Sequence, residues 1–268
     1  MGISKRLDEA RKAYRQGDDQ ASARAHDPAH IAKMTAEPHG GAGSQYIGEM
    51  VYGGLDGIIT TFAVVSGVAG AELGANIVLI LGLANLLADG FSMAVGAYLS
   101  AKSELEYYDR EQERERWEVE HYPEGESAEL YELYIKRGYT DEDARNLVEI
   151  QTRTVDRWVD AMMSDELGMH RDERNPLLNA LATLGSFIVA GAVPLLVYLL
   201  GLIVPVAPQA SFFISLGLSG LALFGLGAAK VFITERHPFK GGLEMLVVGG
   251  LAAGVAYAVG ALLKGIGG

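Results

Sequence analysis

Two aspartates, Asp56 and Asp89, lie inside long apolar stretches of the sequence. A charged side chain at the centre of a bilayer costs about 2.5–3.5 kcal/mol on insertion scales, so such a residue usually faces a partner, a cavity or an ion. Asn85 precedes Asp89 by four residues and Met93 follows it by four, which puts the three side chains on one helical face. Carboxylate, amide and thioether groups on neighbouring membrane helices predict a path for a divalent transition metal. The alternatives are a structural hydrogen bond for Asp56 and helix packing for Asn85 and Met93.

A second group of candidate ligands lies in the charged segment 101–175. Its members share helical faces or lie within one helical turn of each other: Glu111, Glu115, Glu118, Glu126, Glu129, Met162, Met163 and Glu166. Carboxylates with a thioether among them suit Fe²⁺ or Mn²⁺, and the thioether disfavours hard ions such as Mg²⁺. The alternative is a solvated charged surface, with the methionines in a hydrophobic core. Glu49 and Glu244, near the cytoplasmic ends of the first and last apolar segments, are candidates for either interface anchoring or function.

Five apolar segments are long enough, at about 20 residues, to cross a bilayer as helices. We expect them near these residues: 47–70, 76–99, 177–203, 210–233 and 242–264. They are rich in glycine, which is typical of helices that pack closely in lipid, and two pairs have the spacing of such contacts: Gly53-x-x-x-Gly57 and Gly250-x-x-x-Gly254. The sequence therefore predicts an all-α membrane protein.

The second span is predicted to continue beyond the membrane as an extended helix. No Gly or Pro occurs from Ala97 to Tyr122, and the residues are strong helix formers. These residues, about 26 at a rise of 1.5 Å each, add about 39 Å of helix. Pro123 and Gly125 are expected to end it.

Two further helices are expected in the charged segment. One is short, near 127–137, and the other runs from Thr140, in a capping box with Asp143, to Gly168. The predicted organisation thus has four parts. A polar and mobile N-terminal segment (1–44) precedes the first two spans (45–100). An acidic cytoplasmic helical platform that binds metal (101–175) separates them from the last three spans (176–268).

The negative charge of the chain is concentrated in that platform. The formal net charge is −12, and residues 101–175 hold 22 Asp and Glu against 11 Lys and Arg. This argues against nucleic-acid binding and indicates a surface that attracts cations. By the positive-inside rule, the platform, residues 1–49 and the turn that holds Lys230, Arg236 and Lys240 are cytoplasmic. Five spans then place the C-terminus on the far side.

Several classes of function are excluded by what the sequence lacks. It has no cysteine, so disulfides, zinc-thiolate sites and thiol catalysis are excluded. It has no Walker loop or dinucleotide fingerprint, so neither ATP-driven transport nor a permanent cofactor is expected. A proton-coupled carrier is favoured, since a carboxylate can exchange a metal ion for protons. With no signal peptide and no organelle signal, we expect a prokaryotic inner (plasma) membrane.

Three runs of the sequence resemble the vacuolar iron transporter family. They are Tyr52–Ala63 (YGGLDGIITTFA), Ala88–Glu104 (ADGFSMAVGAYLSAKSE) and Gly241–Met245 (GGLEM). With Met162–Gly168 the resemblance covers roughly 45–265. It implies five transmembrane helices per protomer, a homodimer with the ion path between subunits, and export of Fe²⁺, often with Mn²⁺, from the cytosol in exchange for protons.

The resemblance also implies roles for individual residues. It places Asp56 and Met93 in the ion path. It assigns metal binding in the cytoplasmic domain to glutamates and methionines that match the family pattern: Glu115, Glu118, Glu126, Glu129, Met162 and Glu166, with Met163 adjacent. Plant-type members have a glutamate where this chain has Asn85, and Asp89, one turn on, is expected to replace its charge. Fe²⁺ is the expected cargo, with Mn²⁺, Co²⁺ and Zn²⁺ as further candidates.

Three functions compete on these observations. The favoured one is a dimeric metal–proton antiporter, in which the platform collects metal and the membrane residues pass it on. The second is a metal-gated channel or a membrane-bound sensor of divalent metal. The third, a di-iron enzyme, is disfavoured because ferritin-like bundles use Glu-x-x-His pairs. Here that spacing occurs at Glu118 and His121, beside the helix break at Pro123.

Overall fold

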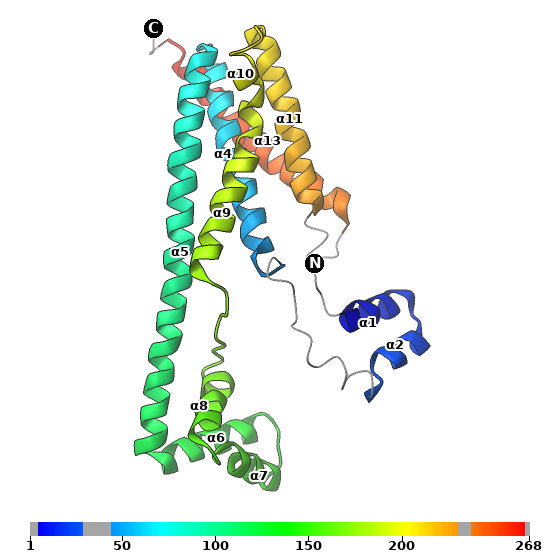
Figure 1. Ribbon diagram of the computed structural model, residues 1–268, viewed down its shortest axis with the longest axis vertical. Helices are drawn as coiled ribbons and strands as arrows, with labels where there is room; N and C mark the ends of the chain where they lie inside the picture. The colour runs from blue at the N-terminus through cyan, green and yellow to red at the C-terminus, as the bar shows by residue number, and fades with distance from the viewer. Residues whose placement is uncertain (1–4, 29–43, 230–236, 266–268) are drawn as a thin grey trace. The chain divides into compact units, whose positions relative to one another are not determined.

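The computed structural model describes residues 5–28, 44–229 and 237–265 (Figure 1). Helices connected by turns and short loops make up these ranges, and no strand occurs in them, which confirms the predicted all-α class. The chain divides into two compact units. We call residues 1–97 with 177–268 the membrane unit and residues 98–176 the acidic unit.

Five helices in the described part of the chain are long and apolar enough to cross a membrane, which confirms the five predicted spans. They are α4 (Ile47–Gly70), the apolar part of α5 (Ala75–His121), α9 (Pro176–Gly191) with its continuation, α11 (Pro208–Ala229) and α13 (Pro238–Leu263). The predicted end of the fourth span lies outside the described residues. The same holds for Lys230 and Arg236, which contributed to the predicted orientation.

The third span differs from the continuous helix that we expected. After α9 the chain forms a 3₁₀ turn, η3 (Val193–Leu195), and a short helix, α10 (Leu196–Leu200). The break falls at Pro194, because proline lacks an N–H and its ring disrupts the preceding helical turn. The Ser215 hydroxyl of α11 donates a 2.7 Å hydrogen bond to the Pro194 carbonyl oxygen. A neighbouring span thereby satisfies a backbone group at the irregular turn.

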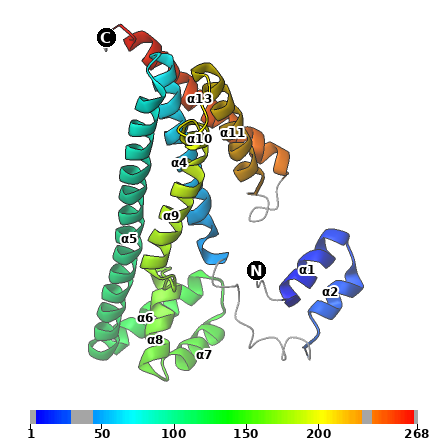
Figure 2. The same ribbon diagram turned by 45° about the horizontal axis from the view of Figure 1, so that its top comes forward.

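Close glycine contacts hold α4 against its neighbours, and Figures 1 and 2 show α4 and α13 side by side. A Cβ on Gly57 would lie 2.4 Å from the carbonyl oxygen of Phe187 in α9. A Cβ on Gly260 of α13 would lie 2.0 Å from the carbonyl oxygen of Gly67. Only glycine permits backbones to approach this closely. The predicted packing at Gly53 and Gly57 is thus confirmed.

For Gly250 and Gly254 the same packing finds no partner in the described part of this chain and stays a prediction. A Cβ at either position would meet no described atom within 4 Å, so this face of α13 is open. Helix α13 packs instead through other glycines, such as Gly249, where a Cβ would lie 2.4 Å from the Leu223 side chain. Adjacent residues on a helix point about 100° apart, so Gly249 and Gly250 lie on different faces of α13.

Each unit has a hydrophobic core of its own. In the membrane unit the core gathers around Val65, Phe187 and Leu195, and in the acidic unit around Leu130 and Met162, all fully buried. The N-terminal segment contains α1 (Lys5–Gln16) and α2 (Asp19–Ala25), which pack together. The predicted mobility of this segment falls partly on residues 29–43, which lie outside the described ranges.

In the acidic unit, α5 continues without interruption to His121, as predicted. The next helix, α6 (Pro123–Lys136), begins earlier than the expected residue 127. Proline is favoured at the first position of a helix, where no N–H partner is needed. Gly125 therefore lies inside α6 and does not break it.

The expected single helix from Thr140 to Gly168 is wrong. The structure has α7 (Asp141–Gln151), α8 (Val155–Ala161) and a π-helical turn, η2 (Met162–Glu166). Thr154 has extended backbone angles before α8, and β-branched threonines disfavour helix interiors. The N-cap is as predicted, since the Thr140 hydroxyl oxygen accepts the Asp143 N–H at 3.2 Å.

Candidate metal centre

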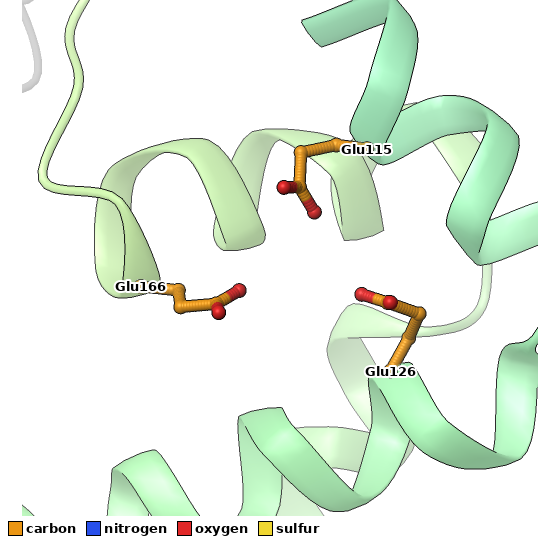
Figure 3. Close-up of side chains that lie close together, drawn as sticks. All are labelled: Glu115, Glu126 and Glu166. Atoms are coloured by element: carbon orange, nitrogen blue, oxygen red, sulfur yellow. The ribbon is translucent and has the colours of Figure 1, made fainter. Parts of the chain in front are cut away.

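Three glutamates from three elements of the acidic unit bring their carboxylates together. Glu115 comes from α5, Glu126 from the first turn of α6, and Glu166 from the end of η2. One oxygen of each lies within 4.8 Å of the others, and Figure 3 shows the three carboxylates pointing towards a common space. We call these three residues the carboxylate triad. Oxygen ligands converging in this way suit a divalent cation.

Two members of the triad are buried to a degree unusual for glutamate. Glu115 is 2 % exposed and Glu126 is 7 % exposed, whereas Glu166 is exposed. Burial raises the pKa of Glu115 to about 7, although Arg114 acts in the opposite direction. Burial, followed by repulsion from Glu115, also raises the pKa of Glu126 to about 7. Partial burial of its carboxyl group raises the pKa of Glu166 as well.

The Oε2 atom of Glu126 carries a further signal. It is buried and has no hydrogen-bond partner among the described residues. A buried polar atom without a partner costs free energy, and ionisation of the group increases that cost. A cation bound by the triad would satisfy this oxygen and remove the repulsion between the carboxylates.

Arg114 holds the neighbouring glutamates of α5. Its guanidinium donates to Glu111 at 3.0 Å and also to Glu115 and Glu118. Glu111 and Glu118, both predicted as candidate ligands, pair with this arginine as Glu115 does, but they lie outside the triad. The sequence analysis missed Arg114, although Glu111 and Glu118 lie at the i−3 and i+4 positions that form ion pairs on helices.

The exposed side of the triad borders a surface cavity. Glu129, Glu132 and Glu166 line this cavity, whose volume is about 380 Å³. Glu129 is hydrogen-bonded to Glu166 and also repels Glu115 and Glu126. Glu129 thus lies next to the triad without joining it, and Lys136 also lines this cavity.

Met162 and Met163 lie in the core of the acidic unit. They are 0 % and 1 % exposed and belong to the hydrophobic cluster that includes Val119, Leu130 and Trp158. Their described contacts are those of core packing, which was the alternative weighed for them.

In the membrane unit, Asp56 lies on α4 and is half-buried. Asn85, Asp89 and Met93 are half-buried on α5, and the charge of Asp89 acts on Asp56. The Nδ2 atom of Asn85 is buried without a partner among the described residues. The hydrogen bond to a neighbouring helix, weighed as the structural role of Asp56, is not found in the described part of the chain.

The two remaining candidates, Glu49 and Glu244, lie on helices that contribute no residue to the triad. Glu49 is half-buried in the first turn of α4, and Glu244 is exposed on α13. The described residues also include buried polar groups that the sequence analysis missed. Asn179 of α9 is 6 % exposed, and its Oδ1 atom has no partner there. An amide at the start of an apolar segment is the signal that could have identified it.

Comparison with known proteins gives a consistent set of relatives. Residues 47–261 match the family model described as the VIT family. A vacuolar iron transporter of Toxoplasma gondii is 37 % identical over 96 % of this chain and 88 % of its own length. One of Plasmodium berghei is 35 % identical over 98 % of both chains. Vacuolar iron transporter 1 of Arabidopsis thaliana is 33 % identical over 82 % of this chain and 87 % of its own.

These relatives bear on two expectations, the extent of the family resemblance along the chain and the membrane in which the protein lies. The Plasmodium berghei alignment covers most of the N-terminal segment 1–44, which the motif resemblance had left out. All three relatives are eukaryotic and carry the name vacuolar. The predicted prokaryotic plasma membrane therefore has no support among them.

Proposed function

The chain belongs to the VIT family, and we propose that it moves Fe²⁺ out of the cytosol in exchange for protons. It is a multi-pass membrane transporter of iron and not an enzyme. The direction of transport, the proton coupling and the residues involved are the proposed part. Mn²⁺ is proposed as a second cargo, because carboxylate oxygens are ligands that suit this ion.

The observation that carries the proposal is the carboxylate triad with its unpartnered oxygen. Glu115, Glu126 and Glu166 offer converging carboxylates, and Glu126 keeps one buried oxygen without a partner among the described residues. We propose that this triad is the centre of a cytoplasmic site that captures the ion. Further ligands join when the ion binds. They are the residues that match the family pattern, Glu118, Glu129 and Met162, with the adjacent Met163.

Proton coupling is proposed from the two membrane aspartates. Asp56 and Asp89 are close enough for the charge of one to act on the other. Two neighbouring carboxylates inside a membrane need either a divalent cation or protons to neutralise them. Exchange of one Fe²⁺ for protons at this pair keeps the site close to neutral in both states. Asn85 and Met93 on the same face of α5 supply softer ligands along the path.

We also propose that the protein works as a homodimer in a vacuole-type internal membrane, with its N-terminus and the acidic unit in the cytosol. In a single chain, only 17 % of the apolar 18-residue stretch of α13 is buried, and only 22 % of the corresponding stretch of α11. Such exposure leaves apolar faces for lipid or for a second copy. The vacuolar names of the relatives favour an internal membrane.

Uptake of Fe²⁺ into proteoliposomes under anaerobic conditions tests the proposed function. We expect uptake to accelerate with an opposing proton gradient and to fall at least tenfold in Asp56→Asn, since a buried charged contact to the ion is worth more than about 1.4 kcal/mol. Glu72→Gln, which removes a carboxylate from the turn between α4 and α5, is the matched control and should transport normally. Wild-type rates in Asp56→Asn would refute the assigned path. Uptake that ignores the gradient would favour the channel.

A further inference from the structure

Arg114 makes a three-way contact on α5. Its Nε atom donates to Glu111, Nη1 to Glu118 and Nη2 to Glu115, so each guanidinium nitrogen serves a different carboxylate. The arginine side chain is 44 % exposed, whereas Glu115 is 2 % exposed. Arg114 therefore lies on the solvent side of the buried triad member.

The charge balance around the triad makes this arginine significant. Arg114 is the positive group with the largest effect on Glu115 and on Glu166 among the described residues, and the other large electrostatic effects on these two come from glutamates. The charged groups that act most strongly on Glu126 are glutamates. In the metal-free protein, one arginine thus supplies the nearby compensation for several carboxylates.

A metal ion and the guanidinium compete for the same atoms. Carboxylate oxygens that accept hydrogen bonds from arginine have fewer lone pairs to offer to a metal. Arg114 occupies one oxygen of each carboxylate, Oε1 of Glu115 and Oε2 of Glu118, and an ion that takes these oxygens displaces two of its three contacts.

We propose that Arg114 is a resident cation that competes with Fe²⁺ for Glu115 and Glu118, so that the acidic unit releases the ion instead of retaining it. The inference rests on the proposed function, because it takes the triad to be the capture site. It assigns Arg114 to the regulation of affinity and exchange rate, and not to metal coordination. A purely structural Arg114 would instead hold the carboxylates in place for the ion, so its removal would weaken binding. The two roles predict opposite signs.

The chain has a built-in probe and a matched control for this test. Its two tryptophans, Trp117 and Trp158, both lie in the acidic unit, so tryptophan fluorescence of the full chain reports on that unit. Arg110, one turn before Arg114, bonds to Glu111 and is 69 % exposed. Arg110→Gln removes the same charge as Arg114→Gln but leaves the contacts to Glu115 and Glu118 in place.

The experiment is an anaerobic titration of the full chain in detergent with Fe²⁺, followed by stopped-flow dissociation into excess chelator. We expect Arg114→Gln to lower the Kd about tenfold, equivalent to about 1.4 kcal/mol, and to slow dissociation. Arg110→Gln should stay within about twofold of wild type, since exposed ion pairs contribute little. Arg114→Lys, which keeps the charge but not the fork of donors, should fall between wild type and Arg114→Gln.

Each other outcome has a distinct meaning. Unchanged or weaker binding in Arg114→Gln, or weaker binding in Arg114→Lys than in wild type, would overturn the competition. An equal gain in Arg110→Gln would also overturn it, because the effect would then be one of net charge. If the wild-type chain binds no Fe²⁺ at all, the proposed capture site fails, and the role of Arg114 fails with it.

Discussion

Replacement of Glu126 by glutamine is expected to stabilise the metal-free protein while removing its function. The pKa of Glu126 is raised from an ordinary 4.5 to about 7, first by burial and then by repulsion from other glutamates. Between these two values the folded state holds a proton that the unfolded state has lost. The free energy of unfolding therefore falls as pH rises through this window. Glutamine keeps the shape of the side chain and never ionises.

The magnitude follows from the two pKa values. Each unit of difference corresponds to 1.36 kcal/mol, so ionisation of Glu126 destabilises the folded state by about 3 kcal/mol at pH 8 and by about 1 kcal/mol at pH 5. In a unit of this size, 1 kcal/mol shifts the Tm by about 4–8 °C. We expect Glu126→Gln to raise the Tm by at least about 10 °C at pH 8 and much less at pH 5. Its affinity for Fe²⁺ at pH 8 should fall at least about tenfold, because a triad ligand is lost.

The assay is thermal unfolding of the full chain in detergent with chelator present, followed by tryptophan fluorescence. Glu124→Gln is the control, since Glu124 and Glu126 both lie in the first turn of α6, where a carboxylate interacts favourably with the helix dipole. Glu124 is exposed, so its replacement should be slightly destabilising. A stability gain in Glu126→Gln that does not grow between pH 5 and pH 8 would refute the reasoning, because the carboxylate would then be solvated and the triad unstrained.

Two further predictions follow from the same structure. Since Glu115 and Glu126 have pKa values of about 7 without metal, an ion must displace their protons, and calorimetric titration should show Fe²⁺ affinity falling at least about tenfold from pH 7.5 to pH 6; a flat profile would contradict this. In α4, Gly57→Ala should lower the stability of the detergent-solubilised protein by about 1–3 kcal/mol, because the new Cβ meets the backbone of α9. Gly54→Ala, whose nearest contacts would be 3.5 Å away, should be tolerated in the same thermal assay.

The membrane spans were predictable because a bilayer sets both their length and their composition. The first span was expected at 47–70 and α4 occupies Ile47–Gly70. Interruptions were harder to predict where they depend on a single residue. Pro194 breaks the third span, and Thr154 precedes α8 in a segment with no glycine or proline between α7 and η2. Local propensity there is weak, and tertiary packing decides the outcome.

The sequence predicted that glutamates of the acidic unit would form the site, but not which three of them converge. Glu115 and Glu118 were expected on one face of the same helix, and both accept from Arg114, yet of the two it is Glu115 that turns into the buried centre. A helical face is broad, and the partners on other helices decide which member points inwards. Glu126 and Glu166 could be suspected from residue type alone. Their convergence with Glu115 requires the helix break and the π turn, which the sequence analysis did not predict.

The two groups of carboxylates differ in what balances their charge, and the difference suits a one-way transfer of metal. In the acidic unit, Arg114 partly neutralises the carboxylates and is expected to keep the ion exchangeable. In the membrane unit, no cationic side chain acts on Asp56 among the described residues, and the neighbouring charge is that of Asp89. Such a pair has no internal substitute for the ion, so it must be occupied either by metal or by protons. In the exchange that we propose, an ion that leaves a site with a competing arginine for one without it moves towards stronger attraction, and protons from the far side then displace it.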